Sequence, residues 1–168
     1  MIFRILIWII FLFGGSALGI WLDLQWFPAL FTNLFFHLVT LIVGILMLRL
    51  VVRASRNTGR ALAKMGREGD IPRMETDTLV TTGFWECMRH PMHFALLFFP
   101  LSVALILGSP TFILILATLE ILIMLAMIKF IEEPEAIIKF GDAYREYQKQ
   151  VPMFNLRPEC WLQLLKED

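Results

Sequence analysis

Four long apolar stretches alternate with short polar stretches along the chain. They cover residues 2–22, 29–52, 94–107 and 111–131. Because a bilayer core of ~30 Å needs roughly 20 apolar residues in a helix, the first, second and fourth stretches have the length of a span. The third is shorter, but it can recruit residues 91–93 before it. The pattern predicts an all-α integral membrane protein with about four transmembrane helices.

Short connections predict that these helices form two hairpins. Asp23–Pro28 joins the first two stretches, and the turn at residues 108–110 joins the last two. Connections this short imply antiparallel neighbours. Pro100 should kink the third span, and Pro134 should bend or restart the fourth helix near Glu132 and Glu133, because proline removes a backbone donor.

The first stretch has a second interpretation. Arg4, an apolar run and the small residues 14–17 imitate a secretory signal and its cleavage site. However, the apolar run continues through residues 20–22, and Trp21 and Trp26 are typical of an interfacial aromatic belt. We therefore favour a retained first span.

After Pro134 the period of the pattern becomes that of an amphipathic helix. Its apolar positions recur at steps of three and four: Ile137, Phe140, Tyr144, Tyr147 and Val151. This cytosolic C-terminal helix should either lie on the membrane or pack on the loop at Gly83, and Pro152 should end it. A last short helix is expected at residues 159–165, with Trp161 as an interfacial anchor.

The composition is typical of a membrane protein, and the distribution of basic residues predicts its orientation in the membrane. Hydrophobic residues make up 58% of the 168 residues, against ~45–50% in an average soluble domain. Fifteen basic and fifteen acidic residues cancel, so no global field indicates nucleic acid. Basic residues cluster after the second span: Arg53, Arg56, Arg60, Lys64 and Arg67.

The basic cluster predicts that the middle segment and both termini are cytosolic. Attraction to anionic lipids together with this topology is a sufficient explanation of the cluster, and we favour it over a role in substrate binding. The sequence divides into residues 1–52, an N-terminal transmembrane hairpin; 53–78, a basic connector; 79–152, a core with the third and fourth spans; and 153–168, a tail.

Cysteine and histidine usage predicts neither a disulfide nor a metal site. Cys87 and Cys160 show no CxxC spacing, and three histidines form no recognisable metal-binding pattern. Both cysteines fall on the predicted cytosolic side, where thiols stay reduced.

Two polar sets should meet at the cytosolic end of the second hairpin. Arg89 and His90 precede the third span, and Glu132 and Glu133 end the fourth. An ion-pair cluster and a binding site are equally good interpretations of this spacing. His37 and Glu120 fall inside predicted spans, where an ionisable group is a functional candidate that usually finds a partner. One possibility is that these two pair with each other.

An ordered set of motifs resembles the isoprenylcysteine carboxyl methyltransferase and phospholipid methyltransferase superfamily. The set consists of Leu79–Gly83, Arg89–Met92, Glu132–Glu133, Phe140–Tyr147 and Val151–Pro152. The resemblance implies a membrane methyltransferase that uses S-adenosyl-L-methionine in a cytosolic pocket. It also implies a lipophilic methyl acceptor that enters from the bilayer.

The resemblance also implies which residues act. The cofactor would be held by Leu79, Val80, Gly83, Arg89, His90, Glu132 and Glu133, and the catalytic set would be His90, His93 and Glu132. Carboxylates suit the amino group and ribose hydroxyls of the cofactor, while arginine or histidine suits its carboxylate. His93 stands where the family usually has tyrosine. It would serve as a general base for a thiol or amine acceptor, or simply as a satisfied interface histidine.

Two other functions fit part of the pattern. A sterol-type membrane reductase that uses NADPH is similar in its C-terminal half, but it should have more spans. A non-catalytic membrane module that retains the scaffold is the other alternative. The acceptor stays open among carboxylate, thiol and amine.

Overall fold

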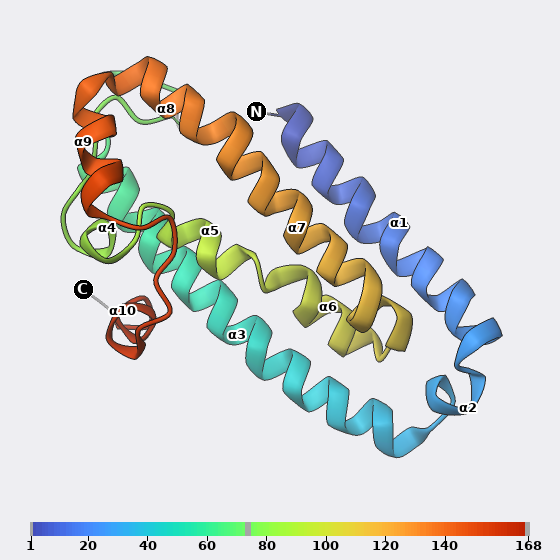
Figure 1. Cartoon of the computed structure of the whole chain (residues 1–168). Coiled ribbons are helices and arrows are strands. Elements are labelled where there is room, and N and C mark those ends of the chain that lie inside the picture. The colour runs from blue at the N-terminus through green and yellow to red at the C-terminus, as the bar shows by residue number, and fades with distance from the viewer. Residues whose placement is uncertain (1, 73–74, 167–168) are drawn as a thin grey trace. The chain divides into compact units, whose positions relative to one another are not determined.

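The computed structural model describes residues 2–72 and 75–166, without the side chains of residues 2–5, and within these ranges it contains helices and no strand (Figure 1). The chain divides into two compact units. Unit 1 comprises the chain up to Arg49 together with Leu97–Ala126, and unit 2 comprises Leu50–Leu96 together with the chain from Met127 onward. Because the described residues form helices and no strand, the predicted all-α fold is confirmed for them. The first and last residues of the chain, predicted to be cytosolic, lie outside the described residues.

The helices are distributed between the units as follows. Unit 1 holds α1 (Ile2–Trp26), α2 (Pro28–Phe31), the first half of α3 (Leu34–Met65), α6 (Phe99–Leu107), the π-helical segment η1 (Phe112–Leu116) and nearly all of α7 (Ala117–Met127). Unit 2 holds the second half of α3, α4 (Phe84–Cys87), α5 (Pro91–Leu96), the π-helical segment η2 (Ile128–Glu132), α8 (Glu133–Phe140), α9 (Asp142–Gln150) and α10 (Pro158–Gln163).

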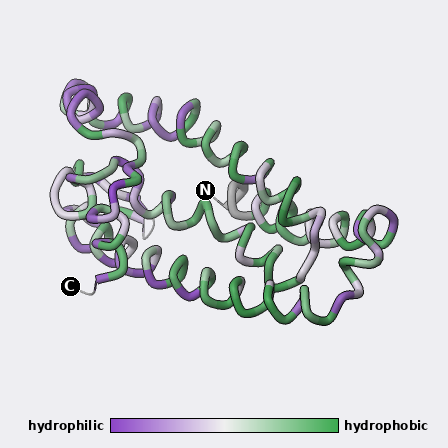
Figure 2. The backbone as a smooth tube through the Cα atoms, turned by 60° about the horizontal axis from the view of Figure 1, so that its bottom comes forward, coloured by the Kyte–Doolittle hydropathy of each residue, from purple (hydrophilic) through white to green (hydrophobic). Residues whose placement is uncertain are grey.

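Three helices within the described residues are long and apolar enough to cross a membrane. They are Leu6–Trp26, Leu34–Met65 and Phe112–Phe140, and Figure 2 shows the long hydrophobic stretches of the backbone. These helices make the chain an integral membrane protein. The predicted third span is a shorter apolar helix, Pro91–Leu107, interrupted between α5 and α6. Pro100 lies in the first turn of α6, so the predicted kink is confirmed as a break.

The predicted helix boundaries need two corrections at the N-terminal hairpin. Residues 23–26 still belong to α1, and α3 begins at Leu34, several residues after the predicted start. Asp23, expected in an open polar link, is fully buried. It accepts hydrogen bonds from the Ser109 hydroxyl and, at 2.7 Å, from the Thr111 amide. The carboxylate therefore caps the start of the helix that follows, a contact that local pattern does not reveal.

Pro134 does not restart the fourth helix. The helix runs from Phe112 to Phe140, and Pro134 lies in the first turn of α8, directly after η2. The Glu133 amide donates to the Ile128 carbonyl across the wider π-helical turn. Such π-helical insertions accommodate an irregularity without ending a helix, and they are frequent at functional sites.

The predicted C-terminal amphipathic helix is two helices. Gly141, at φ 59° and ψ −134°, separates α8 from α9. A side chain is strained at positive φ, so glycine is the residue that permits this break. The predicted apolar face is nevertheless confirmed, since Tyr144 and Tyr147 are buried and Ile137 packs against the same core. Tyr147 Oη donates to the Trp85 carbonyl at 2.6 Å, so the face packs on the segment after Gly83.

Each unit has its own apolar core. In unit 1, Ala104, Phe112 and Ala117 form the buried centre. A Cβ atom on Gly44 of α3 would lie 2.7 Å from the Ile106 backbone nitrogen of α6, so only glycine allows this close approach. In unit 2 the buried centre contains Ala54, Val80, Phe84, Trp85, Met88, Ala95, Tyr144, Tyr147, Cys160 and Leu164.

The prediction of reduced cysteines is wrong in this structure. Cys87 at the end of α4 and Cys160 in α10 form a disulfide, with Cα atoms 5.6 Å apart. The two residues are 73 positions apart in sequence, so spacing carried no sign of the pair. The packing of α10 on the core of unit 2, where Cys160 and Leu164 are buried, brings them together.

Candidate active site

A cavity of about 240 Å³ lies within unit 2. Its wall comes from the end of α3, from the segments before α4 and around α5, and from η2, α8 and α9. The lining residues are Leu62, Thr76, Thr78, Leu79, Val80, Trp85, Arg89, His90, Pro91, Met92, His93, Glu132, Ala136, Phe140, Tyr144 and Tyr147. Most of the cavity surface is apolar, as in many small-molecule sites.

An arginine–glutamate pair forms the buried polar base of the site. The Arg89 Nε donates to Glu133 Oε1 at 2.8 Å, and the Nη2 atom donates to the same oxygen at 2.5 Å. The Arg89 Nη1 donates to the carbonyls of Gln148 and Val151. Because all three guanidinium nitrogens are used within the protein, Arg89 holds the start of α8 and the end of α9 together.

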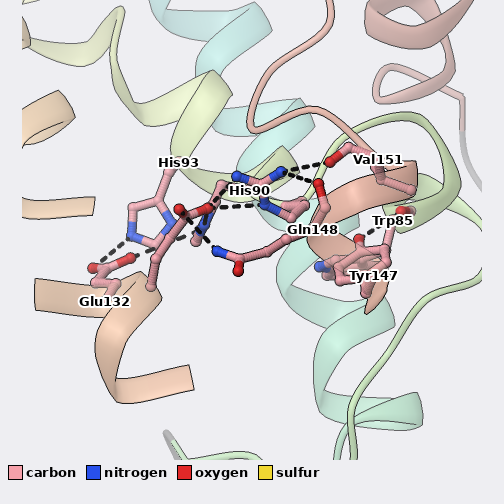
Figure 3. A network of polar contacts seen from close by, with 9 residues as sticks. Trp85, His90, His93, Glu132, Tyr147, Gln148 and Val151 are labelled. Atoms are coloured by element: carbon pink, nitrogen blue, oxygen red, sulfur yellow. Dashed lines mark hydrogen bonds and ion pairs between the residues drawn. The ribbon is translucent and has the colours of Figure 1, made fainter. Parts of the chain in front are cut away.

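His90, His93 and Glu132 meet beside this pair (Figure 3). His93 Nε2 lies 3.2 Å from Glu132 Oε1, and His90 Nδ1 lies 3.9 Å from Glu132 Oε2. The other nitrogen of His90, Nε2, lies 3.4 Å from Glu133 Oε1. The two adjacent glutamates therefore have different surroundings, since Glu133 faces Arg89 whereas Glu132 faces both histidines.

The burial of His90 determines its charge. Desolvation, with a further contribution from the neighbouring His93, lowers the pKa of His90 to about 4, although Glu132 and Glu133 act in the opposite direction. The imidazole is therefore neutral at physiological pH and has one donor and one acceptor nitrogen.

Two tyrosines complete the aromatic side of the cavity. Burial raises the pKa of both hydroxyls, that of Tyr144 to about 12, with the Glu133 carboxylate as the second cause for Tyr144. Both are thus neutral at pH 7. The Tyr144 hydroxyl is buried and has no hydrogen-bond partner within the part of the chain that the structure describes.

The C-terminal segment supports the residues around His90 from behind. The amides of Arg89 and His90 donate to the carbonyls of Pro152 and Met153, at 3.0 Å and 3.3 Å. The Phe154 ring packs against His90, with ring centroids 6.5 Å apart. These contacts hold Arg89 and His90 in position independently of the side-chain cluster.

Six of the sequence-predicted site residues line the cavity: Leu79, Val80, Arg89, His90, His93 and Glu132. Gly83 and Glu133 are not among the lining residues. Gly83, at φ 63°, starts α4, and its amide donates to the Glu86 carboxylate. Glu133 lies behind Arg89, so its contacts support the site instead of facing the cavity.

Sequence reasoning missed other cavity residues. Thr76 and Thr78 lie in an irregular segment and carried no signal. Tyr144 and Phe140 were predicted on the apolar face of the amphipathic segment, but the pattern did not distinguish a core position from a cavity position. His37 and Glu120 belong to unit 1 and do not line this cavity. The His37 Nε2 bonds to the Phe31 carbonyl, so its observed partner is not Glu120.

The same cluster also contains a possible set of metal ligands. One ligand atom from each of His90, His93 and Glu132 lies within 4.8 Å of the other two. The sequence predicted no such group, because the histidines and the glutamate are about forty residues apart and come together only in the fold.

Comparison with known proteins gives one positive result. The family model described as phospholipid methyltransferase matches residues 39–143, which is more than half of the chain. The matched residues include the segments that carry His90, His93, Glu132 and Glu133. No curated protein and no solved structure matches the chain.

Proposed function

Since the chain belongs to the phospholipid methyltransferase family, part of the isoprenylcysteine carboxyl methyltransferase-like superfamily, we propose that it is a methyltransferase that uses S-adenosyl-L-methionine. The methyl acceptor in this proposal is a lipophilic or small molecule that reaches the site from the membrane–cytosol interface. The observation that carries the proposal is the cavity of unit 2, whose lining includes residues from four of the separate sequence motifs of the family.

The chemistry of the cavity wall fits such a donor. When bound, S-adenosyl-L-methionine supplies an electrophilic methyl group on a positively charged sulfur. Phe140, Tyr144 and Trp85 offer aromatic faces, which attract cations. The unpartnered Tyr144 hydroxyl can bond a polar group of the ligand. Leu79 and Val80 offer an apolar surface for a base ring.

Glu132 and His90 are the polar groups that we propose hold the donor. The Glu132 side chain is 21% exposed, so its carboxylate can accept hydrogen bonds from an amino group or ribose hydroxyls. With its Nε2–H donating to Glu133, the neutral His90 can accept a hydrogen bond from an amino group or a hydroxyl through Nδ1. Glu133 and Arg89 position this pair from behind, since Glu133 bonds to both Arg89 and His90.

His93 is the candidate general base for an acceptor that must lose a proton. A thiol or an amine must lose its proton on methylation, whereas a carboxylate acceptor is already ionised at neutral pH. The His93 imidazole lies 3.2 Å from Glu132 and lines the cavity. The proton released by the acceptor would then go to His93. The main contribution of the protein is positioning, because methyl transfer needs an in-line approach.

The remaining part of the proposal is the orientation in the membrane. We propose four spans with the basic end of α3 in the cytosol, because positive residues stay on the cytosolic side. Thr32 and Glu68 are exposed and flank α3, so single cysteines at these positions, with Cys87 and Cys160 replaced by serine, should react with impermeant reagents from opposite sides. Equal sidedness would overturn this topology.

Calorimetric titration of the detergent-solubilised protein tests the function. S-adenosyl-L-methionine should bind and NADPH should not; the reverse would indicate a reductase, and binding of neither would indicate a non-catalytic module. His90→Ala and Glu132→Gln should each weaken donor binding by about 1–3 kcal/mol, the scale of a hydrogen bond to a charged group. The double variant should be non-additive, because both side chains contact one ligand.

Two further variants show whether the effect is local. Glu133→Gln should weaken donor binding through Arg89 and His90. Glu146→Gln is the matched control, since the Glu146 side chain is 62% exposed and pairs with Lys149 on α9. Unchanged donor affinity in His90→Ala, Glu132→Gln and Glu133→Gln, with helical content intact, would return the cluster to a purely structural role.

A further inference from the structure

Two imidazoles and one carboxylate converge on one point of the cavity in unit 2. The His93–Glu132 and His90–Glu132 nitrogen–oxygen distances are 3.2 Å and 3.9 Å. A tetrahedral zinc site with bonds of ~2.0–2.1 Å separates its ligand atoms by ~3.3 Å. The two observed distances lie on either side of this value. One ligand atom from each side chain lies within 4.8 Å of the other two, so rotations of the side chains would bring the three atoms onto one ion.

A second feature concerns the other nitrogen of His90. Its Nε2 atom faces Glu133 Oε1 at 3.4 Å. Glu133 is itself held by Arg89 and, at 3.2 Å, by the Gln148 amide. Metal-binding histidines typically donate their second ring N–H to a carboxylate, which fixes the tautomer. With the proton on Nε2, the lone pair of His90 is on Nδ1, the atom that faces Glu132.

The three side chains also leave room for a further ligand. His90, His93 and Glu132 all line the cavity, with side-chain exposures of 11%, 25% and 21%. Two histidines and one glutamate form a known ligand set of zinc sites that keep an open fourth position. Imidazole ligands select zinc and its neighbours in the first transition row over magnesium and calcium.

We propose that His90, His93 and Glu132 bind a divalent transition-metal ion, with zinc as the natural candidate and its fourth coordination position open to the cavity. Metal binding follows from these side chains alone. A consequence, which rests on the proposed function, is that metal and methyl donor exclude each other, because both use His90 and Glu132. Free zinc would then inhibit the enzyme competitively.

Cobalt titration tests the metal site. The protein should be solubilised in detergent, freed of any affinity tag and kept oxidised, so that Cys87 and Cys160 stay in their disulfide. Co²⁺ should bind at one equivalent, with the visible absorption of a four-coordinate ion. His93→Asn and Glu132→Gln should each weaken binding at least tenfold, and Glu133→Gln should weaken it ~10–100-fold through His90. Glu159→Gln, which changes an exposed carboxylate, should have no effect.

Absence of saturable binding, or equal affinity in wild type, His93→Asn and Glu132→Gln, would overturn the site. A second measurement needs no variant. X-ray absorption of the zinc-loaded wild-type protein should show nitrogen and oxygen ligands at ~2.0–2.1 Å, including two imidazoles. Sulfur at ~2.3 Å would assign the metal to the cysteines and would also overturn the site.

Donor titration with and without zinc tests the exclusion separately. Zinc should lower the apparent affinity for S-adenosyl-L-methionine in proportion to its occupancy. Unchanged donor affinity at full zinc occupancy would overturn the exclusion. If the donor fails to bind the metal-free protein, the proposed function fails, while the cobalt titration still decides the metal site.

Discussion

The two units of this protein place their carboxylates in different surroundings. In unit 1, Asp23 is fully buried and both of its oxygens accept hydrogen bonds, from Ser109 and Thr111. In unit 2, Glu133 is similarly enclosed, but the adjacent Glu132 and the two histidines face a cavity. The comparison teaches that burial of a charge does not by itself mark a site. Ionisable side chains that face a cavity are the better indication.

Glu120 is the exception within unit 1. Its side chain is buried, and one carboxylate oxygen has no hydrogen-bond partner among the described residues. The other oxygen lies 2.9 Å from the position that a Cβ on Gly15 would occupy. The small residue at position 15 therefore leaves space for the carboxylate.

The largest loss of stability should come from breaking the buried Arg89–Glu133 ion pair of unit 2. Arg89→Ala leaves Glu133 buried without its cation, so the free energy of unfolding should fall by about 3–5 kcal/mol. Thermal and denaturant unfolding in detergent measures this loss. The control is Arg145→Ala, because the Arg145–Asp142 pair is exposed and should change stability by less than ~1 kcal/mol. Equal effects of the two substitutions would contradict the role of Arg89.

The disulfide should give the next largest effect. Replacing Cys87 and Cys160 by serine removes a cross-link between residues 73 positions apart, and the typical cost is about 2–4 kcal/mol. Unfolding of the oxidised wild type, the reduced wild type and the double variant measures it. The last two should behave alike. If the oxidised and reduced wild type unfold identically, the bond does not stabilise unit 2.

The buried Asp23 carboxylate should stabilise unit 1 by a smaller amount. Asp23→Ala leaves the buried Ser109 hydroxyl and Thr111 amide without their acceptor, at a cost of about 1–3 kcal/mol in unfolding free energy. Asp23→Asn retains one acceptor oxygen and should cost less. Gln25→Ala, two residues away and exposed, should be neutral in the same unfolding experiment. A neutral Asp23→Ala would remove the proposed capping role.

Mild acidification should give the smallest of these changes in the free energy of unfolding. The pKa of His90 is lowered from 6.5 to about 4 in the folded protein, so the unfolded state binds the proton more readily. Its contribution to stability is therefore present above pH 6.5 and is lost as the pH falls towards 4. His90→Gln should flatten this part of the stability profile. If His90→Gln and the wild type show the same dependence of stability on pH, His90 is not neutral and buried in the folded protein.

Much of the local structure was predictable from the sequence. The apolar stretches predicted the long helices, because a membrane-spanning helix must satisfy its backbone internally and bury apolar side chains in lipid. The positions of Tyr144 and Tyr147 predicted the buried face of α9. Motif order predicted six of the residues that line the cavity and the family itself. These inferences use only length, composition, periodicity and order.

Other features depended on the tertiary structure. The burial of Asp23 and the pairing of Cys87 with Cys160 each require partners distant in sequence. The different partners of Glu132 and Glu133 are the clearest case. Adjacent residues on a helix point ~100° apart, so one faces Arg89 and the other faces His93, but only the packing of η2 against α5 decides which. Local pattern specifies the helices, whereas side-chain partners depend on contacts that a linear sequence does not encode locally.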